Sequence, residues 1–105
     1  MAQIKVIYWR DIPAQVIAES GRGRNRRQVK RELHKRFALA IDEAAMRVGA
    51  NNSDDYLANW RRGDPVYCTD NLEVEVETLA KQMEQVFGTT ELRTLIANGG
   101  VKTPE

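Results

Sequence analysis

Two short apolar stretches near the start of the chain favour β-strands. Residues 4–9 are rich in β-branched and aromatic side chains, and a second set is formed by Val16, Ile17 and Ala18. Residues 10–13 between them favour a turn, because Asp11 can bind the local backbone and Pro13 cannot donate to a β-ladder. The pattern predicts an antiparallel hairpin. Its first strand carries apolar groups on both faces, so we expect both faces to be covered.

A longer run of apolar residues follows a Gly/Arg linker at residues 20–25 and repeats at intervals of three and four. Its members are Val29, Leu33, Phe37, Ala40, Ile41, Ala44 and Val48. This spacing predicts a long amphipathic helix. Asn25 and Gln28 resemble a capping box at its start, and Gly49 is a residue on which helices commonly end.

Helical patterns dominate the rest of the chain. We expect a short helix from Ser53 through Trp60, a short third strand at residues 66–68, a helix beginning near Asp70 and a last helix beginning at Thr89 or Thr90. The expected fold is α+β, with an N-terminal β-hairpin and a short third strand packed against one long and two to three shorter helices. Residues 1–100 form one domain in this interpretation, and residues 101–105 form a frayed tail.

Composition supports one globular domain, because 42% of the 105 residues are hydrophobic and 30% are charged. The chain has no run of about 18 consecutive apolar residues, so no membrane span is expected. Lys5 and Arg10 interrupt the first apolar run, unlike a secretory signal, and the single Cys68 cannot form a disulfide within the chain. These features predict a cytoplasmic protein.

Charge is distributed unevenly although the formal net charge is only +1. Residues 1–62 hold 13 basic and 7 acidic side chains, whereas residues 63–105 hold 3 basic and 8 acidic ones. Half of the 16 basic residues stand within residues 22–36. The chain is therefore strongly dipolar along its length.

The basic segment is the candidate partner-binding or anion-binding site. It contains Arg22, Arg24, Arg26, Arg27, Lys30 and Arg31. Cations in the first turn of a helix oppose its dipole, whereas flexible glycines, free amides and guanidinium groups together suit an anion. The plainer alternative, which the sequence favours, is a solvated face or one that contacts the acidic C-terminal third. The segment lacks a phosphate-loop pattern and an aromatic stripe.

Tyr8, Trp9 and Arg10 form a second candidate surface, since this mixture of residues is enriched at interface hot spots. Core packing of Trp9 is the favoured alternative in so small a chain.

Catalytic and metal-binding chemistry is not indicated. His34 has no nucleophile or carboxylate at a recognisable catalytic spacing, and one histidine with one cysteine cannot complete a usual zinc or iron–sulfur ligand set. Asp64 and Asp70 disfavour a reactive thiolate at Cys68. No catalytic residue, metal or cofactor is therefore assigned, and the sequence favours a protein without catalytic activity of its own.

Several separated blocks resemble a family of small bacterial proteins labelled virulence factor, whose domain also occurs in conserved virulence factor C proteins. The blocks are VIYWRDIPAQV at residues 6–16, Arg36-Phe37 with Ala40-Ile41-Asp42 and Ala44-Ala45-Met46-Arg47, and Asp55-Tyr56-Leu57 with Trp60-Arg61. Stand-alone members are similar to proteins encoded near folate and corrinoid one-carbon enzymes. The resemblance implies an accessory protein and brings no catalytic residues.

These observations lead to three functional hypotheses. The first is a noncatalytic interaction domain whose basic Gly/Arg segment, at a helix N-terminus, binds an acidic protein partner or an anionic ligand. The second, suggested by the resemblance, is a small subunit of a folate or corrinoid one-carbon (methyl-transfer) enzyme system. The third is a nucleic-acid-binding protein.

Overall fold

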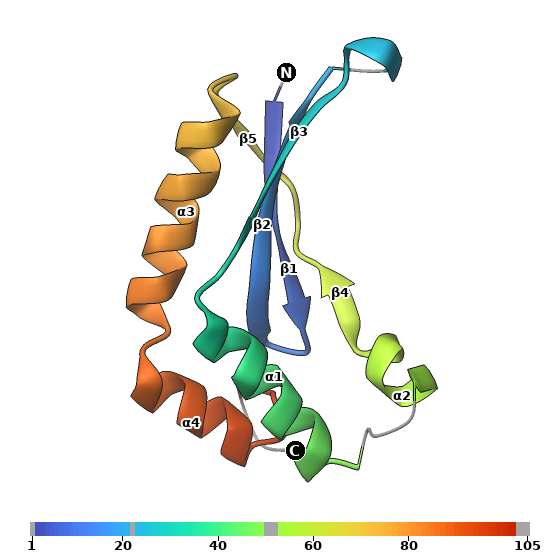
Figure 1. Cartoon of the computed structure of the whole chain (residues 1–105), viewed down its shortest axis with the longest axis vertical. Coiled ribbons are helices and arrows are strands. Elements are labelled where there is room, and N and C mark those ends of the chain that lie inside the picture. The colour runs from blue at the N-terminus through green and yellow to red at the C-terminus, as the bar shows by residue number, and fades with distance from the viewer. Residues whose placement is uncertain (1, 22, 50–52, 103–105) are drawn as a thin grey trace.

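The structure is a computed structural model that describes residues 2–21, 23–49 and 53–102. An antiparallel sheet lies at its centre. The strands are β1 (Ala2–Trp9), β2 (Ile12–Ser20), β3 (Arg27–Glu32), β4 (Trp60–Arg62) and β5 (Val66–Cys68). Their order is β3-β2-β1-β4, and β5 pairs with the other end of β1 (Figure 1). The predicted α+β fold, the hairpin and the short third strand are confirmed.

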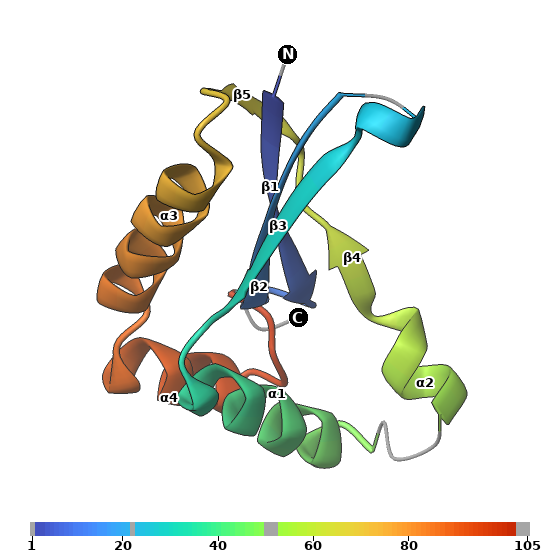
Figure 2. The same cartoon turned by 45° about the horizontal axis from the view of Figure 1, so that its top comes forward.

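Within the described residues, four α-helices and one short 3-10 helix accompany the sheet. The 3-10 helix η1 (Gly23–Asn25) lies between β2 and β3, and the α-helices are α1 (Lys35–Arg47), α2 (Ser53–Ala58), α3 (Leu72–Val86) and α4 (Thr89–Ala97). Helix α3 runs along the sheet, whereas α1 and α4 lie across its end (Figures 1 and 2). No helix in the described ranges combines the length and the apolar character that a bilayer crossing requires.

The core lies between one face of the sheet and helices α1, α3 and α4. Trp9, Ile12 and Leu72 have no exposed surface, and Phe37 is 1% exposed. The Phe37 ring meets Phe87 edge to face, with ring centroids 6.3 Å apart, so α1 is joined to the end of α3. Trp9 donates its indole Nε1–H to the carbonyl oxygen of Tyr56 over 2.9 Å, which satisfies the one polar atom of this buried side chain.

The predicted long helix is wrong in its first part, because residues 27–32 form strand β3 and the helix begins at Lys35. Positions four apart share a face in both structures, since four is close to one helical turn and is also an even number of strand residues. Val29 and Leu33 therefore fit the helical repeat while they face the core from an extended backbone. Strand β3 completes the pairing of β2 from Gln15 to Ser20. The same correction makes α3, with 15 residues, the longest helix.

Helix α1 is capped by His34 instead of by Asn25. The imidazole Nδ1 of His34 accepts a hydrogen bond from the backbone N–H of Arg36 over 3.1 Å. The backbone N–H of His34 itself donates to the carboxylate of Glu84 over 2.8 Å. This surface histidine therefore has a local structural role, and it joins the start of α1 to α3.

The tip of the hairpin is held by the segment that follows α4. The backbone N–H of Asp11 donates to the carbonyl of Gly100 over 2.8 Å, and the Arg10 guanidinium donates to the carbonyl of Gly99 over 3.1 Å. The N–H of Lys102 donates to the carboxylate of Asp11 over 2.7 Å. Residues 98–102 thus form a clasp on the β1–β2 turn, while the rest of the predicted frayed tail, residues 103–105, lies outside the described residues.

Candidate partner-binding surface

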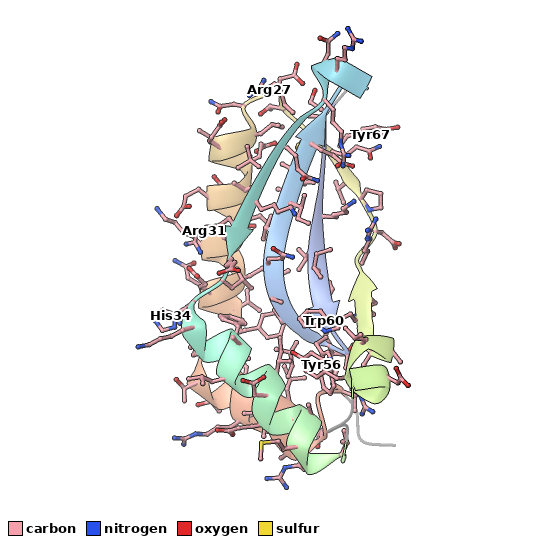
Figure 3. All side chains as sticks on the ribbon, turned by 45° about the vertical axis from the view of Figure 1, so that its right-hand side comes forward. Arg27, Arg31, His34, Tyr56, Trp60 and Tyr67 are labelled. Atoms are coloured by element: carbon pink, nitrogen blue, oxygen red, sulfur yellow. The ribbon has the colours of Figure 1, made fainter. Side chains whose placement is uncertain are left out.

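The basic segment lies on an edge strand of the sheet and not at a helix N-terminus. Since side chains alternate along a strand, β3 sends its cations to two different faces. Arg27 and Arg31 point toward α3, whereas Lys30 lines a groove on the opposite face. The predicted cluster is therefore divided between the two faces of the sheet, and Figure 3 shows Arg27 and Arg31 on the strand beside α3.

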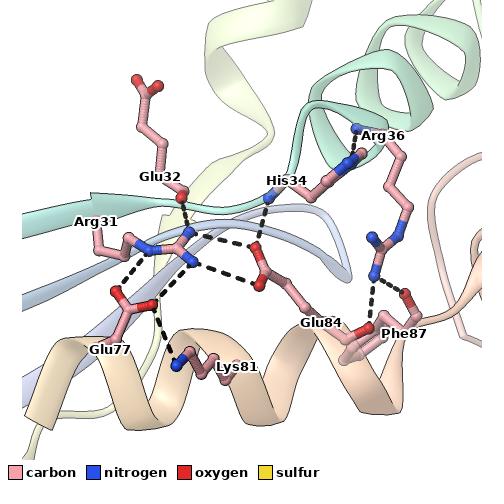
Figure 4. Close-up of polar contacts among 8 residues, drawn as sticks. All are labelled: Arg31, Glu32, His34, Arg36, Glu77, Lys81, Glu84 and Phe87. Atoms are coloured by element: carbon pink, nitrogen blue, oxygen red, sulfur yellow. Dashed lines mark hydrogen bonds and ion pairs between the residues drawn. The ribbon is translucent and has the colours of Figure 1, made fainter.

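On the α3 face, Arg31 is paired with two glutamates. Its guanidinium lies 3.0 Å from the carboxylate of Glu77 and 3.2 Å from that of Glu84 (Figure 4). The hydrogen bonds to Glu77 and Glu84 raise the pKa of Arg31, and the bond from Arg31 lowers the pKa of Glu77. Arg27 makes a longer contact of 3.9 Å with Glu73. This half of the segment meets the acidic C-terminal third, as the plainer interpretation of the sequence predicts.

Arg36 also belongs to the structure of the protein. Its guanidinium donates to the carbonyl oxygen of Glu84 over 2.5 Å and to that of Phe87 over 3.3 Å, at the end of α3. Carbonyl groups at a helix C-terminus have no partner within their own helix, and a cation there is favoured by the helix dipole. Arg36 therefore completes the end of α3 and is not available to an outside anion.

The remaining candidate cations of the Gly/Arg segment differ in their surroundings. Arg26 is bound to Glu19 over 2.6 Å, and this hydrogen bond is the main reason that the pKa of Glu19 is lowered. Arg24 lies exposed on η1, with no ion pair to any described residue. Arg22 lies outside the described residues.

The second candidate surface, around Tyr8, Trp9 and Arg10, is largely internal. Trp9 has no exposed surface and so belongs to the core. Arg10 donates to the side chain of Asn59 over 3.2 Å and also binds Gly99, so it is committed to the turn. Tyr8 is half-buried beneath the guanidinium of Arg61, whose Cζ lies 4.4 Å from the ring centroid. Trp9 and Arg10 are therefore committed to contacts within the protein.

The face of the sheet opposite α3 contains a groove of about 400 Å³. Five cations from four segments line it, and no described carboxylate does; these cations are Lys5, Arg26, Lys30, Arg61 and Arg62. Its remaining lining consists of the glutamines Gln15 and Gln28 and the apolar residues Ile7, Ile17 and Trp60. We call this hollow the cationic groove.

Three of the five groove cations are partly committed. Lys5 lies 3.7 Å from Glu19, the carboxylate that also binds Arg26, and Arg61 lies 3.2 Å from Asp11. Lys30 and Arg62 are exposed and make no ion pair with any part of the chain that the structure describes. The groove therefore retains an excess of positive charge beyond what its neighbours neutralise.

Sequence reasoning found only part of this groove. Arg61 and Arg62 were missed because their strand, β4, has three residues, too few to give a periodic pattern. Their position depends on pairing with Ile7 and Tyr8 of β1, more than fifty residues away. In the sequence, only the fact that these two arginines are adjacent could have indicated that they contribute to a basic surface.

No group of three or more His, Cys, Asp or Glu side chains that could hold a metal ion occurs among the residues described. Burial, together with the nearby Glu75 and Asp70, raises the pKa of the Cys68 thiol, which disfavours a reactive thiolate.

Comparison with known proteins gives a single result. No curated protein matches the chain, and no solved structure matches it. A family described as virulence factor matches residues 7–96, a span that runs from β1 to α4 and includes most of the groove. The chain therefore belongs to the virulence factor domain family.

Proposed function

We propose that this protein is a noncatalytic interaction domain whose cationic groove binds an acidic segment of a partner protein. The observation that carries the proposal is the set of five cations on the sheet face opposite α3, two of which have no counter-ion among the described residues. Acidic side chains laid along the groove would supply the missing negative charge. The contribution of each such contact is modest at an exposed surface, so several are needed together.

The composition of the groove favours a protein segment over a nucleic acid. Nucleic-acid surfaces neutralise several phosphates in a row, and single-strand binders also use successive aromatic platforms. Here three cations already touch carboxylates, and Trp60 is the one aromatic side chain among the described groove residues. The glutamines and isoleucines between the cations suit the mixed polar and apolar character of a peptide. The hypothesis of a small subunit in a folate or corrinoid one-carbon enzyme system remains a prediction based on the family resemblance.

Binding of a fluorescein-labelled peptide of consecutive Glu and Asp residues tests the proposal by fluorescence anisotropy. We expect saturable binding that weakens as salt is added. The double variant Lys30→Glu/Arg62→Glu should reduce affinity at least tenfold, because it places two negative charges in the groove.

The matched control is Arg47→Glu/Arg93→Glu, on α1 and α4. These residues are also exposed and unpaired within the described structure, and the net charge changes by the same amount. Equal losses in the two double variants would show only general charge attraction and would refute the groove. Tight, steeply salt-dependent binding of a single-stranded oligonucleotide, with no binding of the peptide, would support the nucleic-acid hypothesis instead.

A further inference from the structure

A second hollow, which we call the aromatic cleft, lies between α1, the ends of β2 and β3, and the segment from α2 to β4. It encloses about 540 Å³. Tyr56 and Trp60 form one wall, with ring centroids 5.9 Å apart and planes at 78°. Ala38 and Ile41 of α1 contribute the opposite side. Figure 3 shows Tyr56 and Trp60 on the side of the molecule where α1 and α2 approach each other.

The walls of this cleft are held in place by the core. The carbonyl of Tyr56 accepts the indole N–H of the buried Trp9, and the two rings are stacked 6.0 Å apart. Trp60 is paired with Trp9 in the β1–β4 ladder. An aromatic pocket fixed in this way is preorganised, so a ligand does not have to order its walls on binding.

Carboxylates stand among these apolar walls. Glu32 and Asp42 line the cleft, and neither carboxylate has an ion pair or a hydrogen bond to the described part of the chain. Asp42 of α1 lines the cleft together with Tyr56, and burial, followed by the charge of Asp42, raises the pKa of Tyr56. Lys35 is the single cation in the lining. The cleft thus combines an apolar aromatic surface with free hydrogen-bond acceptors.

The aromatic cleft and the cationic groove adjoin each other. Gln15 and Trp60 line both hollows. Gln15 is paired with Ile7 on one side and Glu32 on the other, so it stands in the middle of the sheet where the two hollows meet. A peptide that lies in the groove therefore reaches the cleft with a neighbouring residue.

We propose that the aromatic cleft receives a tryptophan or tyrosine side chain from the acidic segment that the cationic groove binds. This inference rests on the proposed function and narrows the partner to an acidic sequence with one such aromatic residue close to its charged residues. A ring with an N–H or O–H donor matches both properties of the cleft, because the ring packs on Tyr56 and Trp60 while the donor serves Asp42 or Glu32. Phenylalanine packs on the same rings but offers no donor to these carboxylates.

Three labelled peptides separate this inference from the proposed function. They share one acidic sequence and carry Trp, Phe or Ala at one adjacent position. We expect affinity to fall from Trp to Phe to Ala, with at least a tenfold difference between the first and the last, as is typical of a buried aromatic anchor. If all three bind equally well, the aromatic inference is refuted, whereas the proposed binding of an acidic segment in the cationic groove is retained. If none binds, the proposed function itself fails.

Filling the cleft provides the complementary test. Ala38 is exposed on α1, so Ala38→Phe should occupy the cleft without disturbing the core and should remove the advantage of the Trp peptide while the Ala peptide binds as before. Ala97→Phe, at an exposed position on α4, is the matched control and should leave the advantage intact. Asp42→Asn provides a second test that adds no bulk, and it should reduce the preference for Trp over Phe. An undiminished advantage in both Ala38→Phe and Asp42→Asn would overturn the inference.

Discussion

The clasp between residues 98–102 and the hairpin turn predicts that Gly100 tolerates no side chain. Its φ is +96°, a conformation that residues with a Cβ rarely adopt. A Cβ at this position would lie 2.9 Å from Cζ3 of the Trp9 ring and 3.3 Å from Cδ of Arg10. Trp9 has no exposed surface and is tied to Tyr56 by its N–H, so it cannot move away without disturbing the core.

The expected loss for Gly100→Ala has two parts. The positive φ costs roughly 1–2 kcal/mol for an L-residue, and crowding a packed core costs about 1–3 kcal/mol. The lower entropy of the unfolded alanine chain offsets about 0.4–1 kcal/mol of this. We therefore expect a net loss of about 2–4 kcal/mol in the free energy of unfolding, a substantial share of the roughly 5–15 kcal/mol that small domains possess.

Gly49→Ala separates the two parts. Gly49 also has a positive φ, +73°, but a Cβ there meets nothing within 4 Å. This variant should lose about 1 kcal/mol from backbone strain alone. Urea unfolding followed by circular dichroism gives both values, provided that the slopes agree with that of the wild type. Equal losses in the two variants would refute the packing of Gly100 against Trp9.

Three further predictions concern charge and exposure. Arg31→Met should lower the urea midpoint at neutral pH, and the deficit should shrink below about pH 4. Because the pKa of Glu77 is lowered in the folded state, the Arg31–Glu77 pair stabilises the fold above the pKa that Glu77 has in the unfolded chain. This contribution is lost as the pH falls through the pKa of Glu77 in the folded protein. A deficit that is independent of pH would argue for lost packing alone. Cys68 should react with iodoacetamide more slowly than free cysteine at mildly alkaline pH, because its pKa is raised; an equal rate would contradict this. Acrylamide should quench the fluorescence of the Trp9→Phe variant, which retains the half-buried Trp60, more strongly than that of Trp60→Phe; the reverse order would mean that Trp9 is not buried.

The elements that the sequence predicted well are those whose signals are local. Helix α3 repeats its apolar residues over four turns, and the hairpin combines two β-rich stretches with a turn containing Asp11. The structure refines the turn, because β2 already begins at Ile12 and Pro13 lies within the strand. The pairing shifts there, between Ile7 and Tyr8 of the opposite strand, as a β-bulge does.

The edge strand β3 could not be predicted from the same kind of signal. Val29 is its one apolar residue, and the inward position two residues later is occupied by Arg31, where an alternating pattern would require an apolar side chain. That cation is accommodated by Glu77 and Glu84, which are more than forty residues away in the sequence. The division of the basic segment between two faces follows from this tertiary contact, so no local rule could reveal it.

The charge on β3 also bears on how copies of this protein behave toward one another. The outer side of β3 ends the sheet, and unpaired strand edges promote self-association into continuous sheets. Arg27 and Arg31 are paired with glutamates of α3, whereas Lys30 makes no ion pair among the described residues. Two molecules that approached through this strand would bring their Lys30 side chains near each other, and the repulsion would oppose association. The charge on this edge strand thus opposes self-association of the protein, and the repulsion weakens at high ionic strength.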